Sequence, residues 1–186
     1  MKIRLAAYLQ SDSIVDGEGI RTVIWTQGCP HHCLGCQNFE TQDFKGGALV
    51  DIDEVKSMID ELTGQDGITF SGGDPFFQPG PCSVLAKYIK EKGMNVWCYT
   101  GWTYEELITI SKSKKEVMDF LKQIDVLVDG RFVLEKKSYN CIFRGSTNQR
   151  IIDVQKSLAK NKVVLVDKYA HENKIEPRKK PAGLYI

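Results

Sequence analysis

Three of the six cysteines lie within eight residues, in the stretch QGCPHHCLGCQN. Cys29, Cys33 and Cys36 form a C-x3-C-x2-C pattern, and no fourth cysteine follows nearby. Clustered cysteines in a reducing compartment are more often metal ligands or catalysts than disulfides. The glycines and the proline in the stretch disfavour a regular helix, so we expect a loop that wraps around a metal centre.

The number of ligands separates the metal centres that this loop could hold. Structural zinc takes four ligands, so a zinc site would need His31 or His32 as its fourth. A [4Fe–4S] cluster usually takes four cysteines, and three would leave one iron without a protein ligand. An open metal position is typical of a site that binds substrate. We favour the cluster and interpret the histidines as loop residues or hydrogen-bond donors to sulfur.

The elements that position this loop alternate between strand and helix. Strands are expected over residues 22–28, 67–73, 94–101, 125–130 and 149–154, and helices over 51–62, 82–93 and 103–124. This alternation indicates βαβ units and a parallel sheet. A complete eight-fold barrel takes about 250 residues, and the chain has 186. The expected fold class is therefore α/β, a single domain with a partial, open β/α barrel.

Glycine-containing turns follow four of these strands. They are QGC, SGGDP, YTG and VDG, each at the carboxyl end of its strand. Ligands gather at the carboxyl edge of the sheet in such folds, so the four turns predict one shared site.

The composition limits the partners and the compartment. The formal net charge of +1 argues against broad nucleic-acid binding. No apolar run approaches the roughly 18 residues of a membrane span, and the N-terminus lacks a signal-peptide core. We expect a cytoplasmic protein that binds neither nucleic acid nor membranes. The catalytic domain is expected to cover residues 1–153, and residues 154–186 form a C-terminal extension of unknown role, with a strand at 162–170 and an extended tail.

Several stretches resemble a known superfamily. The cysteine pattern after a first strand resembles the radical S-adenosylmethionine (SAM) enzymes, and SGGDP resembles their methionine-binding motif. SIVDGEGIRTVIWTQGC resembles the N-terminal pattern of the glycyl-radical-enzyme activases. TFSGGDPF, WCYTGWTYEEL, DVLVDGRF and FRGSTNQRIID are similar to the activases of anaerobic ribonucleotide reductase. The matches run from about Ser13 to Asp153.

The resemblance implies a radical SAM oxidoreductase with a [4Fe–4S] cluster and SAM as cofactors. Reduction of the cluster would cleave SAM and give a 5′-deoxyadenosyl radical, which would remove a hydrogen atom from a glycine of the partner. The implied partners are the large subunit of anaerobic ribonucleotide reductase, which is the glycyl radical protein, and a low-potential electron donor such as flavodoxin.

The resemblance also implies a set of site residues. Cys29, Cys33 and Cys36 are the expected metal ligands and catalytic residues. The glycines of SGGDP would allow close approach of the methionine group, and Asp74 would accept hydrogen bonds from its ammonium. A glutamine follows the last cysteine where many relatives carry an aromatic residue. The expected cofactor-binding residues are Gly35, Cys36, Gln37, Ser71, Gly72, Gly73, Asp74, Tyr99 and Asp129.

Two further groups of residues are assigned to partner binding. Arg21 is expected to pair with a carboxylate or carbonyl of the partner's peptide. The FRGSTNQR segment is interpreted as a docking loop or a loop against the SAM ribose.

Two other functions stay open at this point. One is a different small radical SAM enzyme, such as a 7-carboxy-7-deazaguanine synthase, whose family also has a GEG near the N-terminus. The other is an electron carrier or a zinc-stapled binding module. A carrier would need a fourth nearby cysteine, which the sequence lacks.

Overall fold

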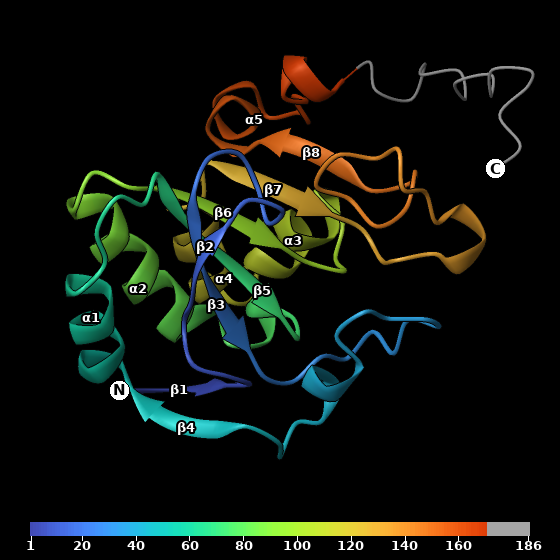
Figure 1. Ribbon diagram of the computed structural model, residues 1–186. Helices are drawn as coiled ribbons and strands as arrows, with labels where there is room; N and C mark the ends of the chain where they lie inside the picture. Colours follow the sequence, from blue (N-terminus) through green and yellow to red (C-terminus); the bar gives the residue numbers. More distant parts are fainter. Residues whose placement is uncertain (171–186) are drawn as a thin grey trace, which may run out of the picture.

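The structure is a computed structural model that describes residues 1–170. One sheet of eight strands organises the chain, in the order β4-β1-β3-β5-β6-β7-β8, with β2 paired to β3 (Figure 1). The strands are β1 (Lys2–Leu5), β2 (Gln10–Ser13), β3 (Arg21–Thr26), β4 (Ala48–Asp51), β5 (Gly67–Gly72), β6 (Asn95–Tyr99), β7 (Val126–Asp129) and β8 (Arg150–Asp153).

The centre of the sheet is parallel, as expected. Strands β3, β5, β6 and β7 run in one direction, whereas β1, β2, β4 and β8 pair antiparallel with their neighbours. The outermost strands of the order, β4 and β8, do not pair with each other among residues 1–170, so the sheet stays open. The α/β class and the partial barrel are therefore confirmed. The short strands β2 and β4 were not expected from the sequence.

The two faces of the sheet bury different side chains because successive strand residues point to opposite sides. Ile24, Phe70 and Cys98 belong to the main core, which includes residues of α1 to α4. Trp97 lies on the opposite face in a smaller cluster with Val128. The helices are α1 (Ile52–Asp60), α2 (Pro79–Glu91), α3 (Tyr104–Ser111), α4 (Lys115–Leu121) and α5 (Val154–Lys160).

The single helix expected over 103–124 is wrong, because the segment forms two helices. The expected capping box at Thr103 and Glu106 is present and begins α3. The helix ends in the SKSK stretch, where the hydroxyls of Ser111 and Ser113 donate to the carbonyls of Ile108 and Ile110. Serine side chains that bond nearby carbonyls compete with the helical backbone pattern, so the chain turns before α4 begins.

Residues 154–170 pack against the same sheet. Val154 belongs to the main core, and Tyr169 packs with Trp97 on the other face. The strand expected over 162–170 is wrong, because only Leu165 forms a bridge, to Ile152, before the short 3-10 helix Asp167–Tyr169. The domain boundary at residue 153 stays a prediction, and the expected extended tail lies outside the described residues. Within residues 1–170, no helix has the length and apolar character needed to cross a bilayer.

Candidate functional site

The three clustered cysteines line one cavity at the carboxyl edge of the parallel strands. This cysteine cavity has a volume of about 150 Å³, and its walls also include residues of the SGGDP, YTG and VDG turns. All three thiols are free and half-buried. The turns that the sequence placed at four strand ends are therefore brought together. The lining residues named by the sequence are Cys29, Cys33, Cys36, Gln37, Ser71, Gly72, Gly73 and Tyr99, and those it did not assign include Asn38, Gln42 and Phe132.

Backbone hydrogen bonds tie the cysteine loop to the SGGDP turn. The N–H of Gly73 donates to the carbonyl of Thr26 at 2.7 Å, and the N–H of Asp74 donates to that of Gly28 at 2.9 Å. A Cβ on Gly73 would lie 2.4 Å from the Gly28 carbonyl oxygen, so only glycine permits this approach. Gly35 has φ of +73°, which glycine adopts without strain, and packs against Leu134.

One buried carboxylate joins three of the sequence motifs. Asp74 of SGGDP accepts from the hydroxyl of Thr100 at 2.9 and 3.0 Å and from the N–H of Gly101 at 3.0 Å. It also accepts from the N–H of Phe76 at 2.9 Å, and its Oδ2 lies 2.6 Å from His31 Nε2. Asp74 is fully buried and is not among the lining residues of the cavity. Its position favours a role in holding the site together.

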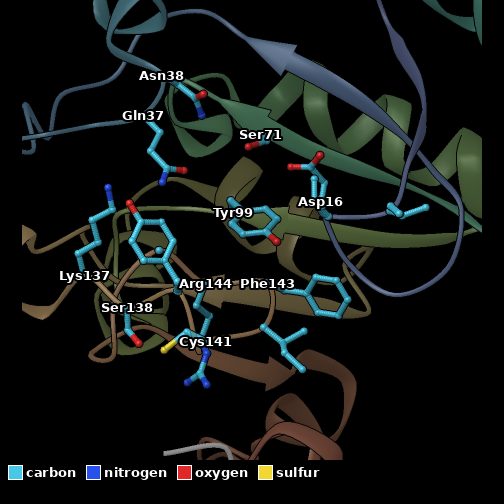
Figure 2. Close-up of a pocket in the computed structure, with 15 residues that line it drawn as sticks. Asp16, Gln37, Asn38, Ser71, Tyr99, Lys137, Ser138, Cys141, Phe143 and Arg144 are labelled. Carbon is cyan, nitrogen blue, oxygen red and sulfur yellow. The ribbon is translucent and has the colours of Figure 1, made fainter. Parts of the chain in front are cut away.

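A larger cavity adjoins the cysteine cavity. It has a volume of about 510 Å³ and shares Gln37, Asn38, Ser71, Tyr99 and Gly145 with it. Figure 2 shows Gln37 and Asn38 on one side, the 137–144 segment on the other, and Tyr99 between them. The shared walls make one continuous space, which we divide into the cysteine cavity and the adjoining cavity.

Asp129 lies away from both cavities. Its carboxylate is 1% exposed and accepts from Arg150 Nε at 3.0 Å and from the N–H of Tyr104 at 2.8 Å. Arg150 also donates to Glu105 at 2.7 Å. These two carboxylates raise the pKa of the Arg150 guanidinium. The expected cofactor contact of Asp129 stays a prediction, while its visible partners anchor β8 to β7 and to the start of α3.

Arg21 does not reach the surface, so its expected contact with a partner's peptide is wrong. Its side chain is fully buried and donates to Thr69 Oγ1, to Asn95 Oδ1 and to two backbone carbonyls, at 2.7 to 2.9 Å. Burial lowers its pKa to about 10. The guanidinium therefore serves as an internal brace, because Arg21 belongs to β3 and its acceptors lie in β5, in β6 and in the loop before β3.

The FRGSTNQR segment contributes to the cavity walls. Gly145 and Gln149 line the cysteine cavity, and Arg144 lines the adjoining cavity. Gln149 Oε1 accepts from the N–H groups of Gly145 and Ser146, which fixes the turn. The segment therefore lines both cavities, and its expected contact, with a partner protein or with the SAM ribose, stays a prediction.

The cysteine arrangement fits a cluster better than a single ion. Among residues 1–170, no group of three or more His, Cys, Asp or Glu side chains is placed to hold one metal ion. The zinc alternative requires such convergence on one point. A four-iron cluster binds each thiolate to a different iron, and the three thiols line one cavity. Burial raises the pKa of Cys29 to about 11, and metal binding would displace its proton.

Comparisons with known proteins identify the class. The family model described as "4Fe-4S single cluster domain" matches residues 15–152. Three curated relatives carry one name, anaerobic ribonucleoside-triphosphate reductase-activating protein. The protein of Haemophilus influenzae is 32% identical over 77% of this chain and 96% of its own length. The Escherichia coli K12 protein is 33% identical over 73% and 90%, and that of Enterobacteria phage T4 is 30% identical over 74% and 86%.

The chain belongs to the 4Fe-4S single-cluster family and, within it, to the anaerobic ribonucleoside-triphosphate reductase-activating proteins. Its family model describes one 4Fe–4S cluster, and its relatives are named as activating proteins of the reductase. Among solved structures, QueE from Escherichia coli matches with a TM-score of 0.47 and 16% identity, over 55% of this chain. The match spans 54% of the QueE chain, about half of its length.

Proposed function

We propose that this protein generates a glycyl radical on the large subunit of anaerobic ribonucleotide reductase. The observation that carries the proposal is the set of three free thiols around one cavity that continues into a second, larger one. When bound, the cluster and SAM supply the chemistry, in which reductive cleavage of SAM gives a 5′-deoxyadenosyl radical that takes a hydrogen atom from the partner's glycine.

The chain's own residues bind and orient the cofactors. Cys29, Cys33 and Cys36 would each hold one iron of the cluster and would leave the fourth iron without a protein ligand, open to SAM. Gly72 and Gly73 present backbone without side chains to the methionine group. Tyr99 is half-buried, and burial raises the pKa of its hydroxyl, so the side chain stays neutral where it lines both cavities.

The glycine-bearing peptide enters through the adjoining cavity. Its walls share Tyr99 and Gln37 with the cysteine cavity, so a peptide there abuts the cofactor. Ile14 and Val15 on one side and Tyr139 on the other are 70% to 90% exposed, although they are large and apolar. Exposed apolar side chains around a cavity favour contact with another protein.

The electron donor, such as flavodoxin, binds on the other side of the cysteine loop. Cys33 accepts a hydrogen bond from the backbone of Phe132. Burial raises the pKa of Cys33, and the nearby charge of Arg131 acts against that rise. Arg131 is exposed near this thiol, Lys136 is exposed five residues further along the chain, and Leu34 is 73% exposed. A basic surface near the cluster suits an acidic donor, because complementary charge steers association. We place the reaction in the reducing cytoplasm, where free clustered thiols persist.

Anaerobic reconstitution with iron and sulfide tests the proposed function. The reduced protein should consume SAM and produce a glycine-centred electron paramagnetic resonance (EPR) signal on added reductase. Cys36→Ala should lose both the signal and the four-iron content, whereas Cys141→Ser should keep the iron and sulfide content, because Cys141 lies outside the cysteine cavity. A reconstituted protein that consumes SAM but leaves the reductase without a radical would contradict the choice of partner.

A further inference from the structure

The two walls of the adjoining cavity contact one cluster of aromatic rings. One wall includes residues 14–16 of the loop before β3, and the other is the 137–144 segment. The rings of this aromatic cluster belong to Trp97, Phe143 and Tyr169, and their centroids lie 5.4 to 6.4 Å apart. Two parts of the chain that are far apart in the sequence therefore share one support.

Tyr169 holds the first wall through Glu18. The Tyr169 hydroxyl donates to Glu18 Oε2 at 2.9 Å, and the neighbouring Lys168 donates to Oε1 at 2.5 Å. Gly17 also lies against the aromatic cluster, because a Cβ there would be only 2.8 Å from the Trp97 ring. Glu18 is two residues beyond the wall, so these contacts fix the end of the loop from which the wall extends.

Tyr169 holds the second wall through Phe143. The two rings pack edge to face, with centroids 5.6 Å apart and an angle of 81° between their planes. Phe143 has φ of +56°, a left-handed conformation that is strained for a bulky side chain and persists only where its surroundings hold it. Phe143 also lines the cavity (Figure 2), so any change in its packing changes the wall itself.

Tyr169 lies beyond the domain that the family model matches, which ends at residue 152. Its side chain is 5% exposed and is not among the lining residues of either cavity. A group in this position acts on a bound peptide only through the walls. We propose that Tyr169 positions both walls of the adjoining cavity and thereby raises its affinity for the glycine-bearing segment of the reductase. This inference rests on the proposed function, because it takes that segment as the ligand of the cavity.

The free energy of each contact limits its effect on binding. A contact that favours the binding-competent walls lowers the apparent Kd by no more than the factor by which it shifts their population. A single hydrogen bond contributes a factor of about three to ten. The ring of Tyr169 adds to this, because it supports the second wall independently of the hydroxyl.

Two variants of Tyr169 separate these contacts. Tyr169→Phe removes the hydroxyl and keeps the ring, whereas Tyr169→Leu removes both. Reconstituted proteins with equal iron content, excess SAM and dithionite are titrated with the reductase large subunit, and the initial rate of glycyl radical formation is followed by EPR. The half-saturating concentration of reductase should rise about three- to tenfold in Tyr169→Phe and further in Tyr169→Leu. Glu18→Gln should raise it as well, because it weakens the same bond from the other side.

Two control variants distinguish positioning from general stability. Tyr88→Phe removes a similar bond, from a tyrosine hydroxyl to the Asp60 carboxylate at 2.6 Å, and neither residue lines the two cavities. Leu158→Ala weakens the packing of α5 on the main core, on the opposite face from the aromatic cluster. It should lower the melting temperature. Both controls should leave the half-saturating concentration of reductase at the wild-type value.

The outcomes separate this inference from the proposed function. Wild-type protein that forms no radical on the reductase would contradict the proposed function. Wild type that forms the radical, together with Tyr169 variants of unchanged half-saturating concentration, would contradict only the role of Tyr169. That role is also refuted if Leu158→Ala raises the concentration as much as Tyr169→Leu, because the effect then follows stability. An equal loss of SAM cleavage without reductase would refute it too, because the defect would then lie at the cofactor.

Discussion

Arg150→Met should destabilise the protein because it leaves a buried carboxylate without its ion-pair partner. Asp129 is 1% exposed and receives two hydrogen bonds from the Arg150 guanidinium. Breaking a buried ion pair from one side costs about 3–5 kcal/mol. The Arg150 side chain is 33% exposed, and Asp129 keeps the N–H of Tyr104, so water and that N–H replace part of the loss.

We therefore expect a loss of about 2–3 kcal/mol in the free energy of unfolding. For a domain of this size, that loss lowers the melting temperature by roughly 4–12 °C. The control Glu105→Gln removes the exposed partner of Arg150, which is 61% exposed, and should cost less than about 1 kcal/mol. Adding Asp129→Asn to Arg150→Met should recover about 1 kcal/mol or more, because no charge is then left buried.

The assay is urea denaturation of the cluster-free protein under reducing conditions, followed by circular dichroism, with the denaturant slope held constant between variants. Equal losses for Arg150→Met and Glu105→Gln would refute the reasoning. The reasoning would also be refuted if Asp129→Asn weakened SAM binding without lowering the free energy of unfolding, because the carboxylate would then serve the cofactor.

Three further predictions concern the sheet edge and its surface. Gly73→Ala should lower the free energy of unfolding by about 1–3 kcal/mol in the same urea assay, because the added Cβ meets the Gly28 backbone. The control Gly80→Ala should be neutral or stabilising by up to about 1 kcal/mol, because the nearest atom to its Cβ lies 3.9 Å away. The hydrogen bond from Arg150 lowers the pKa of Glu105. The ion pair contributes to the free energy of unfolding above the ordinary glutamate pKa, about 4.3, and this contribution is lost as the pH falls through the lowered pKa. The free energy of unfolding of Glu105→Gln should therefore fall less than that of the wild type between about pH 5 and 3. Lys136→Glu should slow cluster reduction by an acidic flavodoxin several-fold at low salt and leave reduction by dithionite unchanged. The control Lys115→Glu should change neither rate. Equal rates of reduction by flavodoxin for the two variants would contradict the proposed donor surface.

The convergence of the strand ends could be predicted because it follows from local patterns. Each parallel strand is apolar and ends in a glycine turn, and the topology of a parallel sheet brings those turns to one edge. Strands β2 and β4 could not be found in this way, because each has four residues and only one of the eight is buried. The break after α3 depends on serine hydroxyls that bond the preceding turn, a choice that periodicity does not reveal.

The roles of the charged residues depended on long-range partners. Arg21 bonds Asn95, which is 74 residues away in the sequence, and nothing local distinguishes it from an exposed arginine. Asp74 and His31 are 43 residues apart, so the sequence showed a turn residue and a loop histidine where the structure has a buried pair. The aspartate of SGGDP illustrates the limit, since the motif located the site correctly but did not show where the carboxylate lies.

The contact between Glu18 and the end of the described chain bears on the order in which the protein is completed during synthesis. Glu18 accepts hydrogen bonds from Lys168 and from the hydroxyl of Tyr169, partners 150 and 151 residues later. A nascent chain that has left the ribosome only as far as β8 has its sheet edge but lacks this clamp on the loop beside the adjoining cavity. The contact can form only after Lys168 and Tyr169 have been synthesised, so this loop beside the cavity gains its link to the C-terminal part of the described chain later than the strands gain theirs to each other.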